Sequence, residues 1–178
     1  LGPGTKLILS VGRLSRRKGF DKVICSLPAL VQGGLDAHYA IIGIGEDEAY
    51  LRQQAENAGM SARVHQLGHV AMEDLPRWYN ACDLFVLANR EISGDTEGFG
   101  IVFLEAGACG KPVIAGRAGG TGSAVLDGFT GLRVDGESGP ELFQALSALL
   151  GDPERSAEFG RAGLERVRTS LSWDAVAE

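Results

Sequence analysis

The sequence predicts an α/β protein built on a doubly wound sheet of six parallel strands. Three observations lead to this prediction. Short apolar runs alternate with stretches of helical periodicity along the 178 residues. Most of the runs are apolar throughout, as expected of strands that helices cover on both faces. Strand–helix alternation of this kind implies right-handed crossovers, and the expected sheet is therefore Rossmann-like.

The expected elements follow one another in a regular order. The strands are predicted at residues 6–12, 37–43, 62–68, 83–88, 111–115 and 130–135. The first helix follows Gly19, because apolar residues recur there at spacings of three and four: Phe20, Val23, Ile24, Leu27 and Val31. Further helices are predicted at residues 46–58, 72–80, 101–109, 140–150 and 153–168, two of them closed by glycine. Ligands of such sheets bind outside the carboxyl ends of the strands.

Composition excludes several classes of protein. The chain is 44% hydrophobic and 22% charged, as soluble globular proteins are. Its net charge of −6 at pH 7 disfavours a nucleic-acid partner. It contains no apolar run of the roughly 18 residues that span a bilayer. The chain begins with a Gly/Pro-rich segment and no methionine, so we expect residues 1–178 to be a single domain cut from a larger protein.

Metal and disulfide chemistry are not expected. Cys25, Cys82 and Cys109 are odd in number and widely spaced, which favours a reduced, cytoplasmic protein. His65 and His69 are four residues apart but flank the end of a predicted strand, where this spacing does not bring two side chains onto one face. The sequence therefore predicts no metal site.

A basic loop follows the first predicted strand. Arg13 ends that strand and Lys18 stands at the entry to the next helix, so both should lie at the carboxyl edge, where a diphosphate could bind. Arg16 and Arg17 have no such positional argument and are predicted to be solvated. The loop matches neither a dinucleotide fingerprint nor a Walker loop, which disfavours an ordinary NAD domain.

An acidic element follows the fourth predicted strand. Glu97 lies in a loop and Glu105 inside a helix, with Gly98 and Gly100 where that helix begins. Glycines there let bare amide hydrogens face an anion, while a carboxylate beside them can accept hydrogen bonds from sugar hydroxyls. This combination suits a ligand with a charged middle and two polyhydroxyl ends, and a nucleotide sugar is such a ligand.

Two stretches carry a resemblance to a known family, and they read SVGRLSRRKGFD and DTEGFGIVFLEAGACGKPVIAG. They are similar to the C-terminal, donor-binding domain of family 4 (group 1) retaining glycosyltransferases, which have the GT-B fold. The similarity extends over residues 6–173. The residues around Asp95-Thr96-Glu97 resemble those of the phosphatidylinositol mannosyltransferase branch. The resemblance implies that this chain is one half of a GT-B fold whose N-terminal domain is absent.

The resemblance also implies roles for individual residues at the phosphates and the donor sugar. Arg13 and Lys18, beside Gly12, match the pair that binds the donor diphosphate. Glu97 matches the acid that contacts the donor-sugar hydroxyls, with help from the backbone at Phe99 and Gly100.

The remaining implied contacts are made to the nucleotide. The amides of Ile101 and Val102 match those that meet a phosphate, and Glu105 matches the acid that binds the ribose diol. The nucleotide base would lie near His69 and Val70.

The expected activity is the transfer of a sugar from a nucleoside-diphosphate sugar to an acceptor hydroxyl, with retention and without a metal or other cofactor. The expected partners are the nucleotide-sugar donor, the N-terminal domain and a sugar or lipid acceptor, with no nucleic acid. The full enzyme would be cytoplasmic or peripheral on the inner face of the membrane. Two alternatives remain open: a nucleotide-sugar 2-epimerase of GT-B type, and a non-catalytic nucleotide-binding module.

Overall fold

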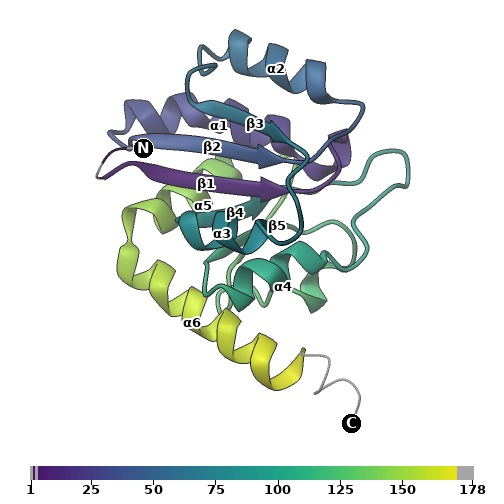
Figure 1. Cartoon of the computed structure of the whole chain (residues 1–178), viewed down its shortest axis with the longest axis vertical. Helices are drawn as coiled ribbons and strands as arrows, with labels where there is room; N and C mark the ends of the chain where they lie inside the picture. The colour runs from purple at the N-terminus through teal and green to yellow at the C-terminus, as the bar shows by residue number, and fades with distance from the viewer. Residues whose placement is uncertain (1, 3, 172–178) are drawn as a thin grey trace.

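A computed structural model of the chain describes residue 2 and residues 4–171. A six-stranded sheet, parallel throughout, runs through its middle (Figure 1). The strand order is β3-β2-β1-β4-β5-β6, which is the order of a Rossmann sheet. The predicted fold class, strand number and Rossmann-like order are all confirmed.

All six predicted strands are present, with ends that shift by at most two residues. They are β1 (Lys6–Val11), β2 (Ala37–Ile42), β3 (Val64–Gly68), β4 (Leu84–Leu87), β5 (Val113–Gly116) and β6 (Leu132–Val134). The central strand β4 is buried along its whole length, as is β5. Continuous apolar runs identified these strands because helices cover both faces of the sheet.

The six predicted helices are also present, together with two short 3₁₀ helices. The helices are α1 (Phe20–Gln32), α2 (Glu48–Asn57), α3 (Leu75–Ala81), α4 (Ile101–Ala108), α5 (Gly139–Gly151) and α6 (Pro153–Ser170), and the turns are η1 (Arg16–Lys18) and η2 (Gly119–Ser123). Helix α3 begins three residues later than the predicted start at Met72. Pro76 lies in its first turn, where a residue without an N–H is tolerated.

Helices cover the two faces of the sheet in two groups. Helix α1 packs against α2 and α5, and α4 packs against α3 and α6 (Figure 1). The buried face of α1 includes Val23, Ile24 and Leu27, as its periodicity predicts, while Val31 is only half-buried. Within residues 4–171, no helix combines the length and the hydropathy that crossing a bilayer requires.

The loops that follow β1 and β4 meet at the carboxyl edge of the sheet, because these two strands are neighbours there. Gly19 is in the left-handed conformation with φ 74°, and a β-carbon on it would lie 2.0 Å from the carbonyl oxygen of Ala88. Only glycine fits this contact. The start of α1 therefore rests directly on the end of β4, at the point where the strand order reverses and ligands of such sheets bind.

Candidate functional site

The first wall of the site is the segment of residues 12–19, called here the cation loop. The Lys18 side chain is only 10% exposed. It folds back over Gly12, whose missing β-carbon would lie 3.5 Å from the Lys18 Nζ. Glycine at position 12 therefore leaves room for the ammonium group at the end of β1.

The second wall is the segment of residues 89–100, called here the acid loop. Its Glu97 is 12% exposed and accepts a hydrogen bond of 2.5 Å from Lys18 Nζ, across a sequence separation of 79 residues. The cation and the carboxylate that the sequence predicted for one site are thus in direct contact. Such a pair is charge-assisted and shielded from water, which strengthens it.

Arg17 joins the same contact, which the sequence analysis did not expect. Its Nη1 donates to Glu97 at 3.1 Å, and its Nε lies 3.0 Å from an Asp95 carboxylate oxygen. The prediction that Arg17 is solvated and without a placed partner is therefore wrong. Its partners lie in another loop, and no local spacing in the sequence indicated them.

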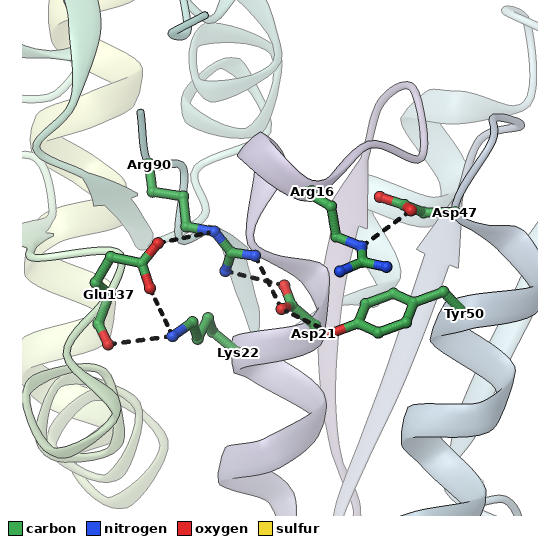
Figure 2. A network of polar contacts seen from close by, with 7 residues as sticks. All are labelled: Arg16, Asp21, Lys22, Asp47, Tyr50, Arg90 and Glu137. Atoms are coloured by element: carbon green, nitrogen blue, oxygen red, sulfur yellow. Dashed lines mark hydrogen bonds and ion pairs between the residues drawn. The ribbon is translucent and has the colours of Figure 1, made fainter. Parts of the chain in front are cut away.

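Arg16 is also held in place, by Asp47 and by Tyr50 of α2 (Figure 2). Its Nε donates to Asp47 at 3.0 Å, and its guanidinium carbon lies 3.2 Å from the centre of the Tyr50 ring. The prediction that Arg16 lacks a placed partner is wrong as well. Arg13, by contrast, is exposed, and its side chain forms no hydrogen bond or ion pair within the described part of the chain.

The start of α4 provides the amide groups that the sequence predicted. Gly100 caps the helix with φ 79°, in the left-handed conformation. The Ile101 and Val102 amides occupy the first turn, where the helix offers them no carbonyl partner. Phe99 and Ile101 expose 38% and 65% of their surface, so this end of the helix is open to a ligand.

Glu105 lies further along α4 and has a partner that the sequence did not reveal. The Tyr79 hydroxyl donates to its Oε2 at 2.6 Å. Burial raises the pKa of the Tyr79 phenol, and the hydrogen bond to Glu105 raises it further, so this proton stays on tyrosine. Tyr79 therefore fixes the orientation of the carboxylate that was predicted to bind a ribose.

His69 and Val70 border an open depression of about 620 Å³ between the end of β3 and α3. His69 is exposed and Val70 half-buried, and Trp78 of α3 lines the same space. His65 does not pair with His69: it stacks on His38 of β2, with the ring centres 5.3 Å apart.

Metal-ligating side chains do not converge within residues 4–171, where no three His, Cys, Asp or Glu side chains lie close enough to hold an ion. Cys25 is exposed, Cys82 buried and Cys109 half-buried, and all three are free thiols.

Together these groups line one edge of the sheet. Cations and helix amides can bind an anion in the middle, while carboxylates on either side can accept hydrogen bonds from hydroxyl groups. The structure places Gly12, Lys18 and Glu97 in contact around one point. It places Glu105 on α4, whose N-terminus follows the acid loop directly.

Comparison with known proteins gives the same picture. The family model described as "Glycosyl transferases group 1" matches residues 2–166. A GDP-mannose-dependent phosphatidylinositol monomannoside mannosyltransferase of Corynebacterium glutamicum is 39% identical over 98% of this chain, which spans 45% of that protein. A D-inositol 3-phosphate glycosyltransferase of Pseudarthrobacter chlorophenolicus is 37% identical, and the chain spans 41% of it. The predicted resemblance to the phosphatidylinositol mannosyltransferase branch is confirmed.

Solved structures share the fold. The Anabaena protein HepE, crystallised with UDP and glucose, superposes with a TM-score of 0.84 at 28% identity, over 98% of this chain and 46% of that one. The C-terminal domain of a group 1 glycosyltransferase of Francisella tularensis gives a TM-score of 0.83 at 27% identity, over 96% of this chain and 88% of that one. This chain thus has the fold of one half of a GT-B enzyme.

Proposed function

The chain belongs to the group 1 glycosyltransferases, and we propose that it forms the nucleotide-sugar-binding domain of a retaining enzyme of this family. One observation carries the proposal: Lys18 and Glu97, from loops 79 residues apart, meet at the carboxyl edge of the sheet beside Gly12 and the start of α4. A cation for a diphosphate and an acid for a sugar are thereby combined at the point where such sheets bind nucleotides.

In this proposal the diphosphate lies between the cation loop and α4. Lys18 and the exposed Arg13 bind its oxygens, and the first-turn amides of Ile101 and Val102 donate to the same group. When the bond between sugar and phosphate breaks, negative charge grows on the leaving diphosphate. These fixed donors stabilise that charge and so lower the barrier to transfer.

The two carboxylates bind the two ends of the donor. Glu97 accepts hydrogen bonds from sugar hydroxyls, next to the backbone at Phe99 and Gly100. Glu105, oriented by Tyr79, accepts from the ribose diol. The base enters the depression beside His69 and Val70.

The donor that we propose to test first is GDP-mannose. The Corynebacterium relative is named as GDP-mannose-dependent, while the Anabaena neighbour was solved with UDP. We propose that no metal is needed, because Lys18, Arg13 and the amides supply the positive charge. The acceptor, a sugar or a lipid, would bind mainly to a second domain, and the whole enzyme would work in the cytoplasm or at the inner membrane surface.

Sugar transfer by the natural protein that contains this chain tests the proposal. Radiolabelled GDP-mannose, UDP-glucose and UDP-N-acetylglucosamine would each be offered with phosphatidylinositol lipids and inositol phosphate as acceptors, with and without a chelator. We expect transfer from one donor, undiminished by the chelator, into an α-linked product. Binding of a donor without any transfer would instead favour a non-catalytic module, and conversion of a donor into its C2 epimer would favour a 2-epimerase.

A further inference from the structure

A buried ion pair lies behind the cation loop, outside the contacts that touch a donor in the proposed function. Arg90, near the start of the acid loop, donates from Nη1 and Nη2 to the two carboxylate oxygens of Asp21, at 3.1 and 2.9 Å (Figure 2). Both side chains are at most 10% exposed. Asp21 lies in the first turn of α1, three residues after Lys18.

The backbone of Arg90 holds the cation loop as well. Its amide donates to the carbonyl oxygen of Arg17 at 2.8 Å. Arg90 therefore binds the cation loop at Arg17, immediately before Lys18, and binds the first turn of α1 at Asp21, three residues after Lys18. Gly19, pressed against Ala88, fixes the point between these two contacts.

Neighbouring groups lock this arrangement from both sides (Figure 2). Glu137, which precedes α5, lies 3.1 Å from Arg90 Nε and 2.7 Å from Lys22 Nζ. On the other side the Tyr50 hydroxyl donates to Asp21 at 3.3 Å. The Arg16 guanidinium stacks on the ring of the same Tyr50. Residues at the start of α2 therefore hold Arg16 of η1, while Arg90 holds the end of the cation loop and the start of α1.

Stability alone is a weak reason for such a pair. Removing two charges from water costs about as much as their attraction returns, and apolar residues of similar volume often serve a core equally well. What the paired guanidinium and carboxylate supply instead is geometry, because two parallel hydrogen bonds fix both distance and angle. Among the residues described here, Arg90 forms no hydrogen bond with Lys18 or Glu97. A substitution of Arg90 can therefore displace Lys18 only through the backbone between Arg17 and Asp21, which Arg90 holds.

We propose that Arg90 and Asp21 form a positioning pair that sets the placement of Lys18 relative to Glu97. The proposal rests on the donor site described under the proposed function. The pair joins the two loops that carry the opposite charges of that site, and it holds the end of η1 in register with the end of β4. Loosening it moves the diphosphate-binding cation without removing any group that touches the donor.

The test uses the natural protein with Arg90→Lys, which keeps the charge but cannot make the paired contact, and Asp21→Asn, which keeps the shape. Misplacing a binding group by about 1 Å can cost up to about 100-fold in rate. We expect each variant to lower kcat/KM for the donor by about 10- to 100-fold, at a temperature where circular dichroism shows it folded. The matched control is Arg117→Lys, at an exposed pair with Glu141 on the same edge, and it should be unchanged.

A double-mutant cycle separates positioning from general damage. Arg90→Lys is combined with Lys18→Met, and nucleoside diphosphate binding is measured by calorimetry, since Arg13 and the α4 amides still support it without Lys18. If Arg90 acts through Lys18, its substitution changes affinity by less than about 2-fold in the Lys18→Met background. Equal losses in both backgrounds overturn the proposal, as does an Arg90→Lys variant with normal kcat/KM. A wild-type protein that neither binds nor transfers any donor would refute the proposed function instead.

Discussion

The cation loop and the acid loop contribute opposite charges to one site, but they are held in different ways. Residues 12–19 are fixed by the fold: Gly19 packs against Ala88 at the end of β4, and Arg90 binds Arg17 before Lys18 and Asp21 of α1 after it. In the acid loop, residues 91–95 are all exposed, and Ser93 has a positive φ of 51°. Its acids Asp95 and Glu97 are held by Arg17 and Lys18 of the other loop.

This difference implies that the two loops serve different parts of the donor. The cation loop is fixed by the fold and is therefore preorganised to bind the diphosphate, the part of the donor on which negative charge grows during transfer. The Asp95 and Glu97 side chains, which ion pairs hold, can exchange those partners for hydroxyl groups when a sugar arrives. Substitutions of the diphosphate-binding cations Arg13 and Lys18 should therefore affect donor binding and transfer together, while substitutions of Glu97 or of the Arg17 side chain that holds it should affect transfer selectively.

The largest effect is expected at the two cations. Replacing Lys18 or Arg13 by Ala in the natural protein should lower turnover by roughly 100-fold or more, as loss of one preorganised donor does. Arg52→Ala, at an exposed pair on α2 outside the proposed donor contacts, is the matched control and should leave turnover nearly unchanged. Equal losses at all three arginine and lysine positions would indicate a diffuse electrostatic patch.

Two glycines with similar backbone conformations distinguish the loops by stability. Gly19 and Gly94 have φ of 74° and 81°, but only at Gly19 would a β-carbon meet other atoms. Gly94→Ala should cost about 1 kcal/mol, the usual strain of a left-handed alanine. Gly19→Ala adds a backbone clash and should cost about 3 kcal/mol or more. Urea unfolding measures both, and equal costs would mean that the cation loop is not clamped on β4.

The sequence predicted most of the fold because its physical cause is local. Doubly covered parallel strands are continuous apolar runs, and the helices between them show their own period, so every strand and helix could be placed. Neighbouring strands end at one edge, which is why Lys18 and Glu97 could be expected in the same site without knowledge of any distance.

The contacts around those two residues could not be predicted. Arg17 pairs with Glu97 across 80 residues and Arg90 with Asp21 across 69, and neither spacing has a period that sequence analysis can use. The contact of Tyr79 with Glu105 could not be predicted for the same reason, because the Tyr79 hydroxyl reaches Glu105 from another helix. The positions of Arg16 and Arg17 in the chain give no sign of their partners, because distant segments fold onto them: Asp47 and Tyr50 onto Arg16, and Asp95 and Glu97 onto Arg17.

The two glutamates should separate binding from transfer. Glu105→Gln weakens a charge-assisted acceptor, so nucleoside diphosphate affinity should fall by about 10- to 100-fold. A 2′-deoxynucleotide should lose little further affinity against this variant. Glu97→Gln should lower turnover by a similar factor while binding of the bare nucleoside diphosphate stays almost unchanged. Calorimetry and transfer assays measure the two effects, and a Glu97→Gln variant that fails to bind the nucleotide would refute the assignment.

A smaller effect is expected at Arg17, the residue that connects the two loops. Arg17→Gln removes one of the two cations on Glu97 but leaves Lys18 in place, so turnover should fall by about 10-fold, the value of one hydrogen bond to a charged group. Nucleoside diphosphate binding should be nearly normal. Asp95→Asn loosens the same loop at its exposed end and should have a milder effect. Should Arg17→Gln weaken nucleotide binding more than transfer, Arg17 would belong to the diphosphate site instead.

The most direct test of the donor site is a calorimetric titration of the 178-residue chain itself with UDP, GDP and ADP, each with magnesium and with a chelator. We expect weak, saturable binding of at least one nucleoside diphosphate, with the same Kd in both conditions and a clear loss of affinity on Lys18→Ala. Absence of heat and of any thermal shift with all three nucleotides would contradict it, and so would binding that requires magnesium.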